Sequence, residues 1–557
     1  MLSARNQSVI GLTVLLLAAG GCSQQATTEN VAGAANEAAS ETHSGMLEGV
    51  VTDSAGKPLA GAFVKLRNET GRLTFMVVSR DGGHFFADKL PPGSYSVQGV
   101  GGDFESDWSA PVRVSNASTA QTDVTLALNR APNLPPAWPR RIPEDEASMD
   151  DLPDHPAKQL ITTACTVCHT EWLVVTSRYD RGTWEGSIEE MREYMTGVGM
   201  SDLTDEDADM LVDYLVENLP PLDPPNPNSR FPRDFVQGEA RNYRVVQYDL
   251  ENLGAETHDV AVDPWGIGWA NQRIGGKISR FDPVTYEYSE VGPPLYTATR
   301  ARPGNLQISR EGIMWLADPF ETRWLSYDIA ADDWTDWPFP TDEIRGQVQG
   351  NSLTLHPDGT IWMAGPGSAR RLNPATAEWS TWDTPTWNDT QLNPGGYGIT
   401  YDGNGRVWMA ENIVDKMARF DGETGEVVEF DIPSDVVAYP RRMDHDPSGD
   451  VWVGLWSSGD ILKIDHETDE MTLITPPIEG SGAYSIDFDE TNGYMWVTLH
   501  KTDIIARYNT ETGEWLMFPL PQAETDVRRI EVDRNNPNRI WWCSTSNNAR
   551  IGYIELL

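Results

Sequence analysis

The feature that most constrains the fold is a tryptophan that recurs at intervals of 44 to 47 residues along the second half of the chain. Each one stands in a short apolar stretch, and seven occur: Trp269, Trp315, Trp362, Trp408, Trp452, Trp496 and Trp541. A period of about 45 residues with several short strands per unit is typical of β-propeller blades. Residues 241–557 are therefore predicted to form a seven-bladed β-propeller.

The last repeat is incomplete, because it ends after its third strand at residues 551–555. A strand-like segment at residues 244–250 precedes the first repeat. Pairing the two ends would complete the last blade and leave no open sheet edge. We therefore predict that residues 244–250 close the ring.

Residues 44–128 alternate apolar and polar side chains between turns rich in glycine and proline, which is the pattern of half-buried strands. The stretches GVVTD, GAFVKL and LPPGSYSV carry the pattern. This segment resembles the carboxypeptidase regulatory-like domain, a small transthyretin-like β-sandwich. The resemblance implies a spacer or adhesion module and no chemistry.

The first residues read as a targeting signal. Arg5 precedes an apolar stretch that is too short to span a membrane, and small residues lead to Cys22. This resembles a bacterial lipoprotein signal, which implies cleavage after residue 21 and lipidation of Cys22; plain secretion is the alternative. Residues 22–43 would be a flexible tether, and residues 129–154 and 222–240 proline-rich linkers. We expect an envelope protein, facing the periplasm and held to the membrane only by its lipid.

The segment Cys165-Thr166-Val167-Cys168-His169 has the spacing of a c-type haem attachment motif. Two thiols on one helical turn reach the two vinyl groups, and the adjacent imidazole faces the iron. A redox CxxC pair and half of a zinc site are the alternatives, but no second Cys/His pair has zinc-binding spacing. The sequence predicts one covalent haem c held by Cys165, Cys168 and His169.

Residues 155–221 show helical periodicity and resemble a small all-α class I cytochrome c domain. The last helix is expected over residues 205–218, with Thr204 as its N-cap. A methionine thioether is the expected sixth iron ligand. The resemblance favours Met191, seven residues after Trp184, with Met195 and Met200 as alternatives; an open site would also fit.

Charge limits the partners. The chain has 42 Lys and Arg against 84 Asp and Glu, a formal net charge of −42. Such a surface repels nucleic acid and favours a basic protein partner. The segments described above together predict a multidomain, mainly β protein.

The repeat also resembles the virginiamycin B lyase (streptogramin lyase) propeller family, through stretches such as GYGIT and VWMAEN. That family uses histidines at the starts of inner strands, an adjacent glutamate and a divalent metal. Aligned on its tryptophans, this chain has at those starts His258, Gly304, Asn351, Tyr397, Arg441, Tyr484 and Arg528. Only His258 matches, so the fold is expected to carry over and the lyase chemistry is not.

These positions are expected to ring the mouth of the central channel. Arg441 and Arg528, flanked by Arg442 and Arg529, would form a cationic spot for a small anionic ligand. The alternative is that the arginines pair with acids of neighbouring blades. The ends of second strands add further acid/base or metal-binding candidates, each also explicable as structural: Asn271, Asp318, Glu411 and His500. Cys543 is expected to be a buried core thiol.

The sequence thus favours an envelope-tethered monohaem cytochrome in periplasmic electron transfer. Its propeller would oxidise a substrate or dock a protein that does, and the haem would pass electrons to a soluble cytochrome or an oxidase. Whether the propeller is itself an enzyme stays open. The alternatives are a lyase with an accessory haem, which would use a divalent metal in the propeller, and a non-catalytic scaffold.

Overall fold

The computed structural model describes residues 44–101, 104–116, 119–126, 148–165, 171–175, 177–197, 203–221, 235–340, 352–391, 393–520, 525–545 and 549–557. The predicted signal, Cys22, the tether and most of both linkers lie outside these ranges. No helix in the described ranges is long and apolar enough to cross a membrane.

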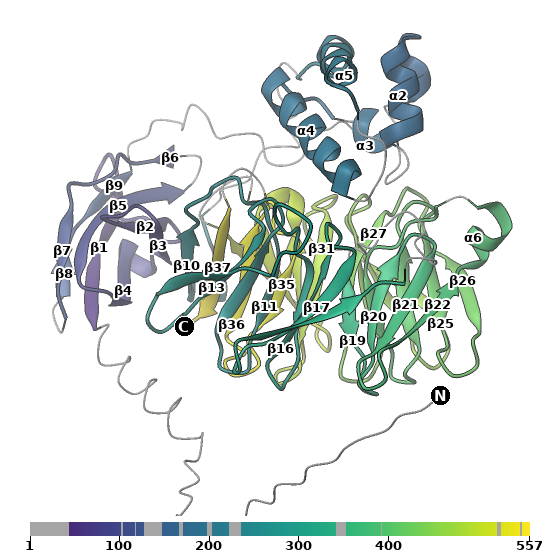
Figure 1. Cartoon of the computed structure of the whole chain (residues 1–557). Helices are drawn as coiled ribbons and strands as arrows, with labels where there is room; N and C mark the ends of the chain where they lie inside the picture. The colour runs from purple at the N-terminus through teal and green to yellow at the C-terminus, as the bar shows by residue number, and fades with distance from the viewer. Residues whose placement is uncertain are drawn as a thin grey trace, which may run out of the picture.

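Seven four-stranded antiparallel blades stand around the central channel of the propeller, which Figure 1 shows from the side. Six of them are built from consecutive strands. Their bounds are, sheet by sheet, β11 Thr257–Val262, β12 Gly268–Gln272, β13 Lys277–Phe281, β14 Tyr288–Val291; β15 Gly304–Ile308, β16 Ile313–Asp318, β17 Arg323–Asp328, β18 Asp333–Pro338; β19 Leu353–Leu355, β20 Ile361–Gly365, β21 Ser368–Asn373, β22 Glu378–Asp383; β23 Ile399–Tyr401, β24 Val407–Glu411, β25 Lys416–Phe420, β26 Val427–Asp431; β27 Pro440–His445, β28 Val451–Leu455, β29 Ile461–Ile464, β30 Met471–Ile474; β31 Ala483–Asp489, β32 Tyr494–Leu499, β33 Ile504–Asn509, β34 Trp515–Pro519. We number these blades 1 to 6.

Blade 7 joins the two ends of the propeller. Its inner strands are β35 (Ile530–Val532), β36 (Arg539–Ser544) and β37 (Arg550–Leu556), and its fourth strand is β10 (Tyr243–Asp249). The pairing of β37 with β10 is antiparallel and in unbroken register from Tyr243↔Leu556 to Asp249↔Arg550. The predicted ring closure is confirmed.

A hydrogen bond explains why tryptophan and a turn aspartate recur together. Trp269 Nε1 donates to Asp263 Oδ2 at 2.9 Å, and Trp408 Nε1 donates to Asp402 Oδ2 at 2.9 Å. The same aspartates accept backbone N–H groups of the tight turn between the first two strands, as Asp402 does from Arg406 at 2.9 Å. The same bond joins Trp452 Nε1 to Asp446 Oδ2 at 3.0 Å, so blades 1, 4 and 5 anchor this turn to a core tryptophan.

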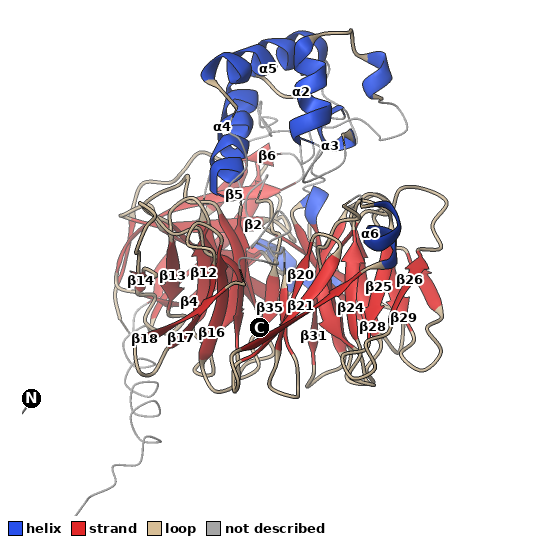
Figure 2. Ribbon diagram, turned by 45° about the vertical axis from the view of Figure 1, so that its right-hand side comes forward, coloured by secondary structure: helices blue, strands red, loops and turns tan. Residues whose placement is uncertain are grey.

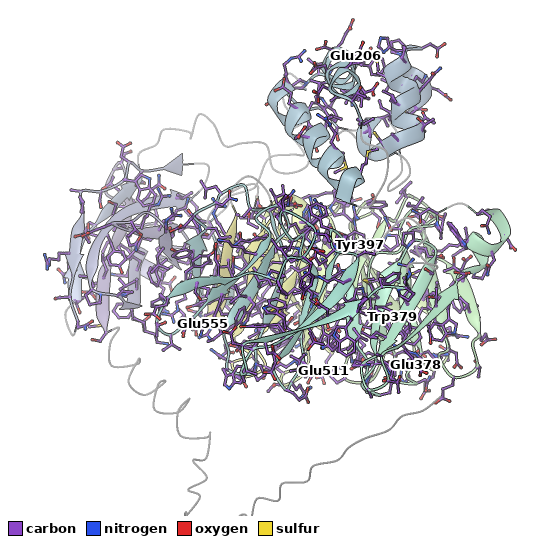
Figure 3. The ribbon with its side chains drawn as sticks, viewed as in Figure 1. Glu206, Glu378, Trp379, Tyr397, Glu511 and Glu555 are labelled. Carbon is purple, nitrogen blue, oxygen red and sulfur yellow. The ribbon has the colours of Figure 1, made fainter. Side chains whose placement is uncertain are left out.

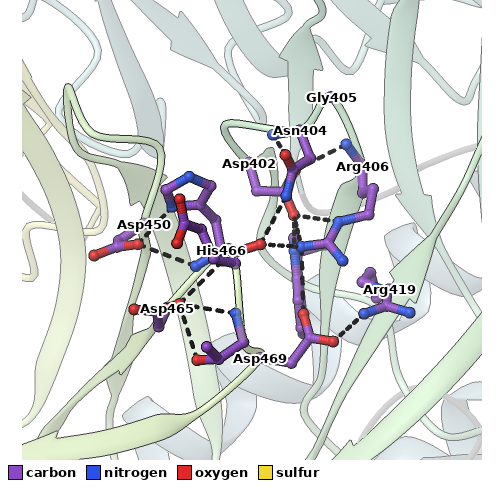
Figure 4. A network of polar contacts seen from close by, with 12 residues as sticks. Asp402, Asn404, Gly405, Arg406, Arg419, Asp450, Asp465, His466 and Asp469 are labelled. Atoms are coloured by element: carbon purple, nitrogen blue, oxygen red, sulfur yellow. Dashed lines mark hydrogen bonds and ion pairs between the residues drawn. The ribbon is translucent and has the colours of Figure 1, made fainter.

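Turns of adjacent blades are also tied to one another, as between blades 4 and 5 (Figure 4). Arg406 Nε donates to Asp402 at 2.8 Å, and Asn404 Nδ2 donates to the His466 carbonyl at 2.8 Å. His466 Nδ1 in turn lies 2.7 Å from Asp450 Oδ1. These contacts fix the blades against each other at the end of the channel where those turns lie.

The β-sandwich is continuous with the propeller. Its strands are β1 Gly45–Asp53, β2 Phe63–Asn68, β3 Leu73–Val78, β4 His84–Leu90, β5 Gly93–Gly101, β6 Phe104–Glu105, β7 Val112–Val114, β8 Thr119–Gln121 and β9 Val124–Leu126. β3 pairs antiparallel with β10, so one nine-stranded sheet runs from blade 7 into the sandwich. One hydrophobic core includes side chains of both parts, such as Leu66 and Tyr553. The spacer is thus rigidly joined.

Four helices form a separate cluster: α2 Pro156–Ala164, α3 Trp172–Val175, α4 Arg181–Gly197 and α5 Asp205–Asn218. They share a core that includes Ile161, Trp184 and Leu211. Thr204 caps α5 in a capping box with Asp207, as predicted. Figures 1 and 2 both show this cluster above one end of the propeller, which we call the upper end.

Candidate functional site

Four of the predicted mouth residues meet at the upper end of the channel. Tyr397 precedes β23, Arg441 lies on β27, Tyr484 on β31, and Arg528 precedes β35. Figure 3 shows Tyr397 on the side of the propeller that faces the helical cluster. The starts of the inner strands of blades 4 to 7 therefore build this site, which we call the upper site.

Arg441 stands in a box of aromatic rings. The distances from its guanidinium carbon to the ring centroids are 3.9 Å for Tyr439, 4.5 Å for Tyr397, 5.2 Å for Tyr484 and 5.7 Å for Trp456. All are within cation–π range. The rings hold the guanidinium in place without neutralising it.

No carboxylate in the described part of the chain pairs with Arg441, and its buried Nε has no hydrogen-bond acceptor there. Buried charges are ordinarily paired, because taking a charge out of water is costly. The electric field of Tyr439, Tyr484 and Tyr397 raises the pKa of Arg441 although burial opposes this, so the side chain stays cationic. The upper site therefore carries one uncompensated positive charge.

The hydroxyls of Tyr397 and Tyr484 are hydrogen-bonded to each other beside this charge. Burial raises the pKa of both phenols, but in Tyr397 the nearby guanidinium groups of Arg441, Arg442 and Arg528 outweigh burial and lower it. The two phenols therefore differ in acidity, although they share one hydrogen bond. Tyr397 is the phenol that gives up its own proton more readily.

Arg528, by contrast, is neutralised. Its Nε and Nη2 donate to Asp526 at 3.0 and 3.1 Å. Asp526 also contacts His500 Nε2, while Trp456 Nε1 donates to His500 Nδ1 at 3.1 Å. An indole only donates, so His500 carries its proton on Nε2. Burial lowers the pKa of His500, which leaves it neutral behind the Tyr484 ring.

His258 belongs to a deeper layer and does not join the upper site. Its Nδ1 lies 3.2 Å from Asp259 Oδ2 and 3.3 Å from Arg442 Nη2. Arg442 reaches across from blade 5 to form a buried ion pair with Asp259, and its Nη1 donates to Ser352 at 3.1 Å. Burial lowers the pKa of His258 to about 4. Asn351, another predicted ring member, lies outside the described residues.

Below this layer lies a cavity of about 850 Å³ that the sequence patterns did not indicate. Three of its acids come from neighbouring blades: Asp444, Asp487 and Glu531. Each accepts a backbone N–H of the next inner strand, from Phe488 at 3.1 Å, Val532 at 2.6 Å and Val262 at 3.1 Å respectively. Their shared period along the repeat is the signal that could have revealed them. They join the blades together.

Two parts of the chain are similar to known proteins. Residues 46–127 match the carboxypeptidase regulatory-like domain family. The propeller is similar in fold to the virginiamycin B lyase propeller.

Streptogramin B lyase matches it with a TM-score of 0.50 and 18% sequence identity, over 58% of this chain and 100% of the lyase. Selenomethionine-substituted virginiamycin B lyase from Staphylococcus aureus matches at 0.48 and 18%, over 57% and 100%. No curated protein matches the sequence.

The lyase-like propeller has a different set of groups from the one that the family resemblance implied. Tyr484 and Arg528 occupy strand starts in its last two blades where the resemblance implies histidines. Within the described ranges, no three His, Cys, Asp or Glu side chains converge in a way that could hold a metal ion. The similarity therefore concerns the fold.

The second-strand ends of the lyase-like propeller have structural contacts. Asn271 Oδ1 accepts the backbone N–H groups of His258 and Asp259 at 3.0 and 2.7 Å. Asp318 accepts the Arg302 N–H at 3.1 Å and pairs with Arg323. Glu411 differs: burial, reinforced by Glu429, raises the pKa of this fully buried acid to about 8.

Of the predicted haem residues, the structure describes three. Cys165 follows α2 as its C-cap and is half-buried. On α4, Met191 is half-buried and Met195 is buried in the helical core. Cys168, His169 and Met200 lie outside the described residues. Cys543 is fully buried, as predicted, and burial raises its pKa.

Proposed function

We propose that the chain is an exported, lipid-anchored monohaem cytochrome c in which the upper site of the propeller binds the compound, or the face of a partner, that supplies the electrons. The observation that carries this proposal is the CxxCH motif, whose first residue, Cys165, ends helix α2 in the cluster above the upper site. Cys165, Cys168 and His169 would hold the haem, with Met191 as the preferred sixth ligand and Met195 or Met200 as the alternatives.

The described residues of the helical cluster fit such a group. Trp184 is buried, and its indole N–H has no acceptor within the described part of the chain. The Arg178 guanidinium donates to the Val175 and Ser177 carbonyls and has no carboxylate partner there. A haem brings two propionates, which are acceptors for both donors. Cys165, half-buried beside this core, is accessible for a thioether bond.

The position of the helices supports an electron donor at the upper site. Electron tunnelling needs short distances, and the cluster lies over the end of the propeller where Tyr397 stands (Figure 3). Arg441 lies against the Tyr397 ring. Bound haem would accept one electron at a time. Arg441 would hold an anionic donor beside the Tyr397–Tyr484 pair, whose hydroxyls would hydrogen-bond to it.

The net negative charge of the chain supports the proposed transfer of electrons from the haem to a partner protein. In the helical cluster, the first turn of α5 is acidic at Asp205, Glu206 and Asp207. A basic soluble cytochrome or oxidase domain would be steered to such a surface, with an on-rate that falls as salt rises.

The test uses the full-length, haem-loaded protein in its oxidised form under anaerobic conditions. A pool of small metabolites is added, and the visible spectrum is recorded for the wild type and for Arg441→Gln. We expect the wild-type bands to shift to the reduced form, at least about tenfold faster than in the variant. A wild-type haem that stays oxidised with every fraction of the pool argues for a lyase or a scaffold. Absence of any haem spectrum contradicts the whole proposal.

A further inference from the structure

The charge balance of the upper site limits what it can bind. Arg528 is neutralised by Asp526, and Arg442 by Asp259 one layer deeper. Of these three arginines, Arg441 is the one with no carboxylate partner among the described residues. A single uncompensated guanidinium is matched by a monoanion; a dianion would leave a buried negative charge.

The shape of the Arg441 guanidinium limits the class of ligand further. Tyr439 and Tyr397 lie against the Arg441 guanidinium, with ring centroids 3.9 and 4.5 Å from its carbon. Its Nε has no acceptor among the described residues, so its N–H edge is the group that a ligand would meet. That planar edge matches the two oxygens of a carboxylate and holds them in a bidentate arrangement.

A second polar group stands beside the arginine. In the Tyr397–Tyr484 pair, one hydroxyl proton is used between the two oxygens. The other proton and the remaining lone pairs are free to meet a ligand, so the pair presents both a donor and an acceptor. Both rings contact the Arg441 guanidinium, so a group bound here is adjacent to the carboxylate site.

We infer that the upper site binds a small hydroxycarboxylate, with its carboxylate on the N–H edge of Arg441 and its hydroxyl on the Tyr397–Tyr484 pair. This inference deepens the proposed function and rests on it for the role of the site as the place where the electron donor binds. His500 and Asp526 hold Tyr484 and Arg528 in position and do not touch the ligand.

Binding can be measured without turnover, by calorimetry on the full-length ferric protein with three matched probes. Glycolate has both groups, acetate lacks the hydroxyl, and glycolamide lacks the charge. We expect glycolate to bind about tenfold more tightly than acetate, and glycolamide to show no binding at the same concentrations.

Variants then assign each contact. Arg441→Gln should weaken glycolate and acetate at least about tenfold, and Tyr397→Phe should reduce glycolate to the level of acetate and leave acetate unchanged. Arg441→Lys keeps the charge and the ring contacts but loses the two parallel N–H donors of the guanidinium. Glycolate and acetate should therefore both bind several-fold more weakly. The melting temperature of this variant should be unchanged.

Arg371→Gln is the control, because Arg371 also stacks on two rings, Trp362 and Trp382 at 5.5 and 4.9 Å, but lies on an outer part of blade 3. It should bind glycolate like the wild type. Glycolate binding that is unchanged in Arg441→Gln, or equal affinity for glycolate, acetate and chloride, would overturn the inference.

The two proposals fail separately. If glycolate binds through Arg441 but no hydroxycarboxylate in the metabolite pool reduces the haem, the inferred ligand class holds and the electron-transfer proposal is wrong. If the haem is reduced by a fraction that contains no carboxylate, the electron-transfer proposal holds and the inferred ligand class is wrong.

Discussion

Arg441 and Arg442 are neighbours on β27, yet they belong to chemically different regions of one channel. Arg441 faces the upper site and is surrounded by aromatic rings. Arg442 bounds the lower cavity and is locked to Asp259 and Ser352 on other blades. Alternation along the strand sends consecutive side chains to different surroundings. The comparison separates an arginine that is available to a ligand from one that holds the ring together.

The carboxylates of the lower cavity and of the upper site have different partners. In the lower cavity Asp444, Asp487 and Glu531 accept backbone N–H groups from the next blade. In the upper site, among the described residues, the acid that pairs with a mouth arginine is Asp526, and it contacts both Arg528 and His500. The carboxylates of the lower cavity therefore hold neighbouring blades together. The upper site has an arginine, Arg441, that is available to a ligand.

The largest expected effect tests the arginine pair directly. Arg442→Gln should destabilise the protein by about 3–5 kcal/mol, because it leaves Asp259 as a buried, unpaired charge. Arg441→Gln removes only ring contacts and should lower stability by about 1–2 kcal/mol. Denaturant unfolding of the two variants measures the difference. Equal losses would mean that Arg441 is also structural.

Glu411, at the end of β24, allows a test by pH. Its folded pKa of about 8 is above the unfolded value, so its contribution to stability is full at low pH and is lost as pH rises through 8. Glu411→Gln should therefore stabilise the protein at pH 9 by about 1–3 kcal/mol and have little effect at pH 4. Thermal melts across pH give the readout, and a parallel pH profile in wild type and variant would contradict it.

A smaller change addresses the lower cavity. Burial, with help from Asp444 and Glu531, raises the pKa of Asp487 well above its usual range. Asp487→Asn keeps an acceptor for the Val532 N–H and removes the like charge, so we expect a gain of about 1 kcal/mol at pH 7. A loss of stability would show that this carboxylate is needed as an anion. Glycolate binding at the upper site should not change.

The smallest signal is spectroscopic. Because the three arginines lower the pKa of Tyr397, one phenol should ionise ahead of the others in an absorbance titration near 295 nm. Tyr397→Phe should remove this first step, and Tyr243→Phe, at a buried site where the pKa is raised, should leave it in place. An unchanged first step in Tyr397→Phe would assign it to another tyrosine.

Much of the fold could be predicted because it is repeated. The spacing of the tryptophans predicted the propeller, and the unfinished last repeat predicted that β10 would close the ring. The continuous sheet between β10 and β3 could not be predicted in this way, because strand pairing between distant segments depends on which edges meet in space. No local pattern of residues 73–78 indicates their partner.

The candidate site was partly predictable for the same reason. Alignment of the repeats placed Tyr397, Arg441, Tyr484 and Arg528 at equivalent strand starts, and these meet in the structure. His258 has the same position in its repeat but pairs with Asp259 and Arg442 in a deeper layer. The haem ligands are a local motif, and their geometry remains a prediction because Cys168 and His169 lie outside the described residues.

The sequence by itself determined the repeat, the closing strand, the β-sandwich and the residue types at the channel mouth, since all of these follow from local pattern and period. Only the tertiary structure decided which arginine is neutralised and which is left charged. That depends on contacts between blades, such as Arg442 with Asp259, whose partners are far apart in the chain and become neighbours only when the ring is closed.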